Sequence, residues 1–252
     1  MKEIIKNWYE RLHFPEEYRK EFETLLADAA LSECAISDYQ GTGNFQMDFL
    51  MSLYFCEEAL SEARKKGIPD EVQIETLSDL VAWTKAYVQE NHRLGLYEYA
   101  WIRFGLTQKL FKLGRLEFMP AENCVEVHIP SGGPFDPALC EESFQRAEEF
   151  FPSCMPEHSY DHYCIHSWLL DDTLAKFLKP DSNILHFAGL FQPGDRNESD
   201  SALRYVFGWD ATRENLRRYT PRNSFMQGMY DYVLGGGKLY EVYGTRERKN
   251  KR

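Results

Sequence analysis

Two runs of the sequence place titratable side chains at alternate positions. Glu126 and His128 alternate with valines in the first run, and His162, Cys164 and His166 follow one another at a spacing of two in the second. Residues two apart share one face of a β-strand, so each run would present its polar side chains together. If the two strands were parallel neighbours, both sets could open onto one cleft.

These side chains are suited to more than one kind of chemistry. Glu126 or His128 could remove a proton from an amine, directly or through a water molecule. Cys164 beside a histidine could instead be a nucleophile, and the second run could bind zinc together with Cys154 and His158. The structural alternative is that these polar residues are satisfied at a sheet edge or under a helix.

A glycine loop is the second candidate site. Ser131, Gly132 and Gly133 separate the first run from a helix that Asp136 and Pro137 are suited to open. Free N–H groups in the first turn of that helix, with its dipole, favour an anion such as a pyrophosphate. The alternative is a tight turn that happens to use glycine.

The elements that must position these residues change character along the chain. Up to about residue 106, apolar residues recur at helical spacing, and a four-helix region is predicted after Pro15, over 46–66, from about residue 70, and near 96–104. Segments 109–118 and 124–130 are suited to an antiparallel hairpin with a turn at 119–123. A helix from Asp136 to about residue 151 and a strand over 160–170 then predict a parallel pair with a right-handed crossover.

The last third of the chain has weaker patterns. Segment 182–191 could be a helix or a strand, and Asn183 would ordinarily be a helix cap there. Segments 202–209 and 238–244 are predicted as strands, and 213–234 as a helix.

Composition narrows the class of protein. The 252 residues include 29 Lys and Arg against 40 Asp and Glu, a net charge of −11, which argues against binding nucleic acid through its phosphates. No apolar run approaches the ~18–20 residues needed to span a bilayer, and the first residues lack the apolar core of a signal peptide. The six cysteines include no Cys-x-x-Cys pair, so reduced thiols and a cytoplasmic location are expected.

Four segments together resemble a known family. They are 111–118, 127–134, 164–171 and 181–184, which read Phe-Lys-Leu-Gly-Arg-Leu-Glu-Phe, Val-His-Ile-Pro-Ser-Gly-Gly-Pro, Cys-Ile-His-Ser-Trp-Leu-Leu-Asp and Asp-Ser-Asn-Ile. They are similar to a bacterial family of acyltransferases that pairs a helical N-terminal domain with a GNAT-like C-terminal domain, and the resemblance covers nearly the whole chain. It implies a mixed sheet, acyl-CoA as the donor, and an amine or similar acceptor.

The resemblance also implies roles for particular residues. Ser131, Gly132 and Gly133 match the segment whose backbone amides hold the CoA pyrophosphate, and Asn183 matches an asparagine early in the helix after the fifth strand. The sequence departs from the superfamily at two points. The loop lacks the usual Gln or Arg ahead of its glycines, and the position of the general-acid tyrosine holds Leu190 or Phe191.

We therefore expect an α+β protein with a helical N-terminal domain (1–106) and a GNAT-like mixed-sheet domain flanked by helices (107–252). The expected activity is direct transfer of an acyl group, acetyl in the simplest case, from acyl-CoA to an amine, with Glu126 or His128 as the base, His166 in the same cleft, and no metal. The alternatives are a non-catalytic acyl-CoA or small-molecule binding module, and a transferase or hydrolase that uses Cys164 and a histidine. The sequence does not name the acceptor or the oligomeric state.

Overall fold

The first 106 residues fold as helices. The structure is a computed structural model, and it describes residues 1–133 and 135–249. Six α-helices lie in this region: α1 Lys2–Arg11, α2 Arg19–Asp28, α3 Phe45–Lys65, α4 Asp70–Leu77, α5 Asp79–Asn91 and α6 Tyr99–Leu106. The sequence predicts four; the structure adds α1 and divides the helix from Asp70 into α4 and α5. The division falls at Ser78, whose hydroxyl donates to the Glu75 carbonyl oxygen (2.6 Å) and so competes with helical bonding.

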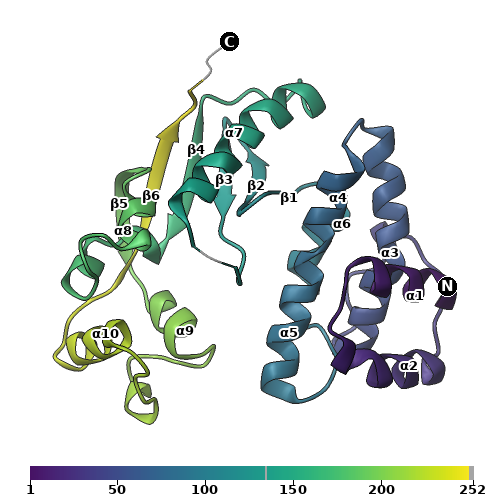
Figure 1. Cartoon of the computed structure of the whole chain (residues 1–252), viewed down its shortest axis with the longest axis horizontal. Helices are drawn as coiled ribbons and strands as arrows, with labels where there is room; N and C mark the ends of the chain where they lie inside the picture. The colour runs from purple at the N-terminus through teal and green to yellow at the C-terminus, as the bar shows by residue number, and fades with distance from the viewer. Residues whose placement is uncertain (134, 250–252) are drawn as a thin grey trace. The chain divides into compact units, whose positions relative to one another are not determined.

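Helix α3 is the centre of this helical region. Asn44 caps its start by accepting the N–H groups of Gln46 and Met47, each at 3.2 Å. Buried residues occur on all sides of α3, as is typical of a helix surrounded by others. Figure 1 shows α3 beside α1 and α6, both of which pack against it. The helical region therefore has a core of its own.

The first two strands form a hairpin that packs against α4. Strands β1 (Phe111–Leu113) and β2 (Leu116–Ala121) are antiparallel, with Lys112 opposite Glu117. Because β2 extends to Ala121, the turn predicted at 119–123 is shortened to residues 122 and 123.

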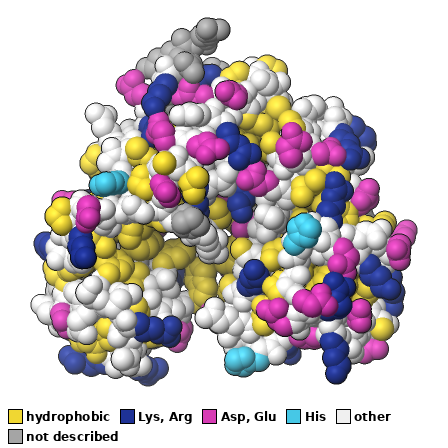
Figure 2. Space-filling view, viewed as in Figure 1, with side chains coloured by type: hydrophobic (Ala, Val, Ile, Leu, Met, Phe, Trp, Pro, Cys, Tyr) yellow, Lys and Arg dark blue, Asp and Glu magenta, His cyan; other side chains and the backbone are white. Residues whose placement is uncertain are grey.

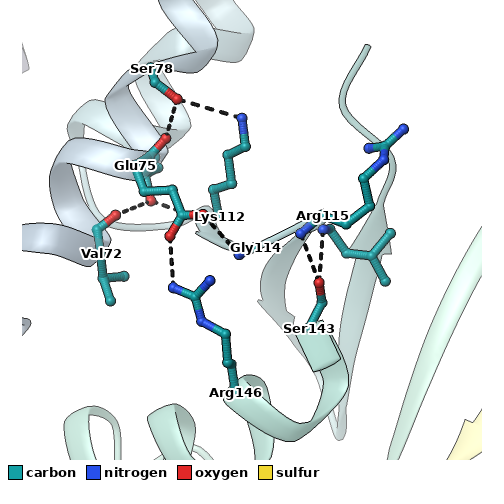
Figure 3. A network of polar contacts seen from close by, with 10 residues as sticks. Val72, Glu75, Ser78, Lys112, Gly114, Arg115, Ser143 and Arg146 are labelled. Carbon is teal, nitrogen blue, oxygen red and sulfur yellow. Dashed lines mark hydrogen bonds and ion pairs between the residues drawn. The ribbon is translucent and has the colours of Figure 1, made fainter. Parts of the chain in front are cut away.

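Polar contacts hold this hairpin from two sides (Figure 3). On one side Glu75 of α4 accepts the Gly114 N–H at 3.1 Å and pairs with Arg146 of helix α7 (Pro137–Cys154) at 2.7 Å. On the other side the buried Ser143 hydroxyl of α7 accepts the N–H groups of Arg115 and Leu116, at 2.8 and 3.3 Å. The β1–β2 turn is thus attached both to the helical region and to the helix of the crossover.

The strands of the described chain form one mixed sheet in the order β1-β2-β3-β4-β6-β5. The remaining strands are β3 Cys124–His128, β4 His162–Ser167, β5 Gln192–Glu198 and β6 Tyr240–Glu247. Strands β3 and β4 are parallel, which confirms the predicted pair, and α7 connects them. Strand β6 runs antiparallel to both β4 and β5. The expected α+β class, with a mixed sheet flanked by helices, is confirmed.

The described residues form two compact units. The first contains 1–120, 128–133 and 143–158, and the second contains the described parts of 121–127, 134–142 and 159–252. The first unit thus holds α1–α6 together with the first hairpin, so these units divide the chain elsewhere than at residue 106. The second unit has a small core around Leu174, Leu203, Met229 and Leu239.

Three predictions for the last third of the chain are wrong. Segment 202–209 is not a strand but part of helix α9 (Ser201–Phe207). Its apolar residues at 202, 203, 206 and 207 follow a helical period, although valine and aromatic side chains favour strands. Strand β5 is absent from the prediction because its seven residues are all exposed and show no apolar alternation. The helix expected over 213–234 is shorter: Pro221 interrupts it, and α10 (Ser224–Leu234) begins after the cap Asn223.

Segment 182–191 resolves to a helix. In α8 (Asn183–Ala188) the cap is Ser182, whose hydroxyl accepts the Ile184 N–H at 3.3 Å. Asn183 is therefore the first helical residue rather than the cap.

Charged side chains of both signs lie on the surface. Basic and acidic side chains are interspersed on the face drawn in Figure 2, where the described residues form no continuous basic area. None of the described helices is long and apolar enough to cross a bilayer.

Candidate functional site

The pairing between β3 and β4 is short. The register joins Cys124 to His162, Val125 to Tyr163 and Glu126 to Cys164. It ends there, although β3 continues to His128 and β4 to Ser167. On its other edge, β4 stays paired with β6 through Ser167. The β3 edge of β4 beyond Cys164 therefore lies outside the β3–β4 ladder, and an extended ligand could use its backbone groups.

A polar cluster lies where this pairing ends. Glu126 is directly opposite Cys164, and His166 is directly opposite Tyr243 of β6. The rings of His166 and Tyr243 lie 4.9 Å apart, and Tyr243 acts to lower the pKa of the Cys164 thiol. The Cys164 and Cys124 sulfur atoms are 2.7 Å apart. The second unit thus brings Glu126, Cys164 and His166 together on one face, as the alternation predicts.

Tyr243 is the member of this cluster that the sequence analysis does not single out. The sequence does show that Tyr243 and Thr245 are two residues apart and so share one face of the last strand. It does not show that this strand pairs with β4, and only that pairing brings Tyr243 next to His166. Residues 190 and 191, at the superfamily's tyrosine position, carry no hydroxyl.

The environment of Cys164 makes it a weak nucleophile. Its side chain is 6% exposed. Burial, and then the neighbouring Cys124 and the Glu126 charge, raise the pKa of the Cys164 thiol, while the Tyr243 hydroxyl acts in the opposite direction. A thiol with a raised pKa is largely neutral at neutral pH, whereas the thiolate is the reactive form. This geometry weakens the alternative in which Cys164 carries an acyl group.

His128 lies in the first unit, at the end of β3. Its ring meets Trp101 of α6 edge to face, with the ring centroids 4.9 Å apart. The Trp101 indole N–H donates to Asp79 of α5 at 3.0 Å, and the Trp83 indole donates to the same oxygen at 2.9 Å. His128 is thus held against α6 by an aromatic contact between two half-buried rings. Whether it shares a cleft with Glu126 and His166 remains a prediction.

Two buried carboxyl groups lie beneath this contact. Glu117 of β2 and Asp79 are 1% and 4% exposed. Burial, and then the charge of Asp79, raise the pKa of Glu117 well above its usual range, although Lys112 and Arg115 act against the shift. Burial also raises the pKa of Asp79, opposed by Lys112 and the two indole N–H donors. Burial and the neighbouring carboxyl group therefore both favour the protonated form of Glu117.

The glycine loop has left-handed backbone at both of its glycines. Gly132 and Gly133 have φ angles of +82° and +70°, and a Cβ on either would meet open space. Asp136 accepts the Ala138 N–H at 2.8 Å, so it caps α7 as expected and satisfies one of the amides in the first turn. Pro134 lies outside the described residues. Ser131, Gly132 and Gly133 are all exposed.

Helix α8 contacts Phe135, which lies two residues before α7: the Phe135 and Phe187 rings are 5.0 Å apart. Asn183 is exposed at the start of α8, so its amide is accessible to a ligand. No group of three His, Cys, Asp or Glu side chains that could hold a metal ion occurs among the described residues.

Comparison with known proteins supports this architecture. Residues 3–104 match the model of the N-acyltransferase N-terminal domain, and residues 92–246 match that of the GNAT-like C-terminal domain. No curated protein matches the chain.

Solved acyltransferase structures share the fold over nearly the whole chain. One, in complex with decanoyl-CoA and teicoplanin, is 22% identical over 96% of this chain and 87% of its own, with a TM-score of 0.80. A variant in complex with octanoyl-CoA is 22% identical over 98% of this chain and 88% of its own, with a TM-score of 0.81.

The buried acid pair gives a prediction about stability. Because folding raises the pKa of Glu117, the folded state binds more protons than the unfolded state above the usual glutamate pKa of 4.5. Glu117 therefore costs stability as pH rises, by up to ~1.4 kcal/mol per pH unit. Glu117→Gln removes this pH-dependent cost. The free energy of unfolding of the variant, relative to that of the wild type, should therefore rise as pH increases.

The measurement is urea unfolding at about pH 5, 6 and 7. Glu122→Gln, in the exposed turn before β3, is the control and should follow the wild type at each pH. A difference between Glu117→Gln and wild type that stays constant with pH would show that Glu117 ionises normally in the folded protein.

Proposed function

The chain belongs to the GNAT-like C-terminal domain family, and we propose that it transfers an acyl group from acyl-CoA to an amine acceptor by direct attack. The observation that carries this proposal is the β3–β4 ladder that ends at Glu126 and Cys164 while β4 continues to Ser167. That edge offers backbone groups to an extended donor, and the polar cluster stands beside it. The similar structures that hold decanoyl-CoA and octanoyl-CoA support a longer acyl group than the acetyl group expected from sequence.

The donor would be held by backbone groups at its two ends. The N–H groups of residues 131–133 and the first turn of α7 suit the CoA pyrophosphate, because a helix N-terminus favours an anion. Asp136 already uses one amide of that turn, so the glycine amides would carry more of the contact. Strand amides beyond Cys164 would polarise the thioester carbonyl as negative charge develops on its oxygen.

The acceptor would lose its proton to Glu126 or His128. The amine nitrogen attacks the carbonyl carbon and forms the C–N bond, the C–S bond breaks with its electron pair going to sulfur, and CoA departs as its thiolate while the acceptor's proton passes to the base. Glu126 is half-buried opposite Cys164, and His128 is half-buried against Trp101, so both are fixed by packing. The amine acceptor and the cytoplasmic location are part of the same proposal.

Removing the base tests this proposal directly. A general base contributes about 10²–10⁴-fold to a rate, so either Glu126→Gln or His128→Asn should lower kcat in that range. The assay is transfer from a series of acyl-CoA donors to a panel of amines, followed by mass spectrometry of the product. Matched controls are Glu122→Gln and His92→Asn, both at exposed positions in other parts of the chain.

Two results would contradict the proposal. Wild-type turnover in both Glu126→Gln and His128→Asn would show that neither side chain of β3 is the base. Acyl-CoA binding without transfer in the wild type would favour the non-catalytic module, and a labelled Cys164 in a single turnover would favour the covalent route.

The glycine loop gives a separate prediction. Gly133 has a positive φ and open space around it, so Gly133→Val strains the loop without displacing a packed neighbour. We expect its Kd for CoA to rise at least tenfold, which corresponds to about 1.4 kcal/mol. Gly236→Val is the control, because Gly236 also has a positive φ and open space, but lies between α10 and β6.

Isothermal titration calorimetry with CoA compares the two variants. A Kd for Gly133→Val equal to that of Gly236→Val would exclude the loop from donor binding.

A further inference from the structure

A pocket beside helix α6 carries positive charge that the proposed reaction does not use. Its volume is about 200 Å³, and its wall includes one face of α6, a residue before α3 and a residue after α6: Tyr99, Arg103, Phe104, Thr107, Gln40 and Lys109. Pockets that enclose a whole small-molecule ligand usually measure roughly 300–1,000 Å³. This pocket therefore has room for a small ion, or for one end of a larger molecule.

The charges of this wall are both positive. Arg103 and Lys109 supply them, and in the described part of the chain neither side chain pairs with a carboxylate. The Nε atom of Arg103 is buried, and it donates to no acceptor among the described residues. A buried donor without an acceptor is costly in free energy, and an oxyanion in the pocket would remove that cost. The planar fork of a guanidinium group fits both oxygens of a carboxylate or phosphate.

The neutral polar groups of the wall are already engaged. The Thr107 and Tyr99 hydroxyls donate to the carbonyl oxygens of Arg103 and Tyr39, at 2.7 and 3.3 Å. The side-chain amide of Gln40 donates to a carbonyl oxygen three residues earlier, at 3.1 Å. A ligand would therefore find its hydrogen-bond donors on the two basic side chains.

A buried carboxylate near the wall has donors of its own. Burial raises the pKa of the Tyr99 phenol; the Arg103 charge acts against this shift and the Asp48 charge adds to it. Asp48 is 3% exposed. Its carboxylate accepts the Tyr39 hydroxyl at 2.6 Å, and the N–H and hydroxyl of Thr42 at 2.8 and 3.0 Å. Asp48 is thus held by these donors and forms no ion pair with Arg103.

The wall also offers apolar surface next to the charges. Phe104 is 36% exposed, which is unusual for a large apolar side chain in this protein. Its ring is held from behind by Trp101, with the ring centroids 5.9 Å apart. An apolar or aromatic body attached to an anionic group could therefore cover Phe104 and remove its ring from water.

We propose that this pocket is a binding site for an oxyanion, the carboxylate or phosphate group of a small molecule that carries an apolar or aromatic body. Arg103 binds the two oxygens through its guanidinium, Lys109 adds a second positive charge, and Phe104 contacts the body. The inference does not depend on the proposed acyl transfer, because it concerns binding alone.

The test is an NMR titration of the full chain with benzoate, phenyl phosphate and neutral benzamide. Benzoate or phenyl phosphate should shift the amide signals of residues 99–109 in a saturable manner, with a Kd on the order of 1 mM. The tighter of the two identifies the group as a carboxylate or a phosphate. Benzamide has the same ring without the charge and should bind at least about tenfold more weakly.

Two variants assign the binding to the basic pair. Arg103→Gln should raise the Kd of the tighter anion at least about tenfold, which corresponds to about 1.4 kcal/mol. Lys109→Gln should raise it by a smaller factor, and because Lys109 is exposed this variant should fold normally even if Arg103→Gln does not. Arg93→Gln and Lys85→Gln, at exposed positions in the same helical region, are the matched controls and should bind as the wild type does.

Three results would overturn the inference. Shifts that do not saturate, or that occur only outside residues 99–109, would show that the basic side chains are merely solvated. Equal affinity for benzamide and the anions would show that charge is not recognised. An unchanged Kd in Lys109→Gln and in a folded Arg103→Gln would place the anion elsewhere, whatever the outcome for acyl transfer.

Discussion

The early end of the β3–β4 ladder is the constraint on which the site depends. Strand β6 pairs with β4 from His162 to Ser167, while β3 pairs with β4 only up to Cys164. One edge of β4 is thus fixed, and the other is open to a ligand over its last residues. Because the two strands are parallel, a helix must cross between them. That helix is α7, and its N-terminus follows the glycine loop. The parallel pairing of β3 and β4 therefore accounts for both elements proposed to hold the donor, which are the open edge of β4 and the loop before α7.

Burial decides which side chains of the site can exchange protons. Cys164 and Glu117 are buried, and their raised pKa values favour neutral forms. Glu126 is half-buried and retains the accessibility that a base requires. Tyr243 is half-buried on β6, which pairs with the other edge of β4. The ability of each side chain to exchange a proton therefore depends on its position in the sheet as much as on its residue type.

The sequence predicts the parts of this arrangement that have a strong local signal. The alternation of Glu126 and His128 with valines, and the cap at Asp136, lead to the parallel pair and its crossover helix. The resemblance identifies the family that the family models then show. Strand β5 has no such signal, because it is exposed along its whole length and is held only by pairing with β6. Tyr243 could not be found for a related reason: its neighbours Cys164 and His166 are about 80 residues away, and only the strand order brings them together.

The most direct test of this account is hydrogen–deuterium exchange with a non-hydrolysable acyl-CoA thioether. If the donor lies along the open edge of β4, backbone amides within 165–167 and in the loop 131–133 should become protected, while those of the edge strand β5 should not. This result would place the donor without depending on turnover or on the identity of the acceptor. Protection confined to other segments, with residues 165–167 unchanged, would contradict the central claim that the end of the β3–β4 ladder is the acyl-CoA site.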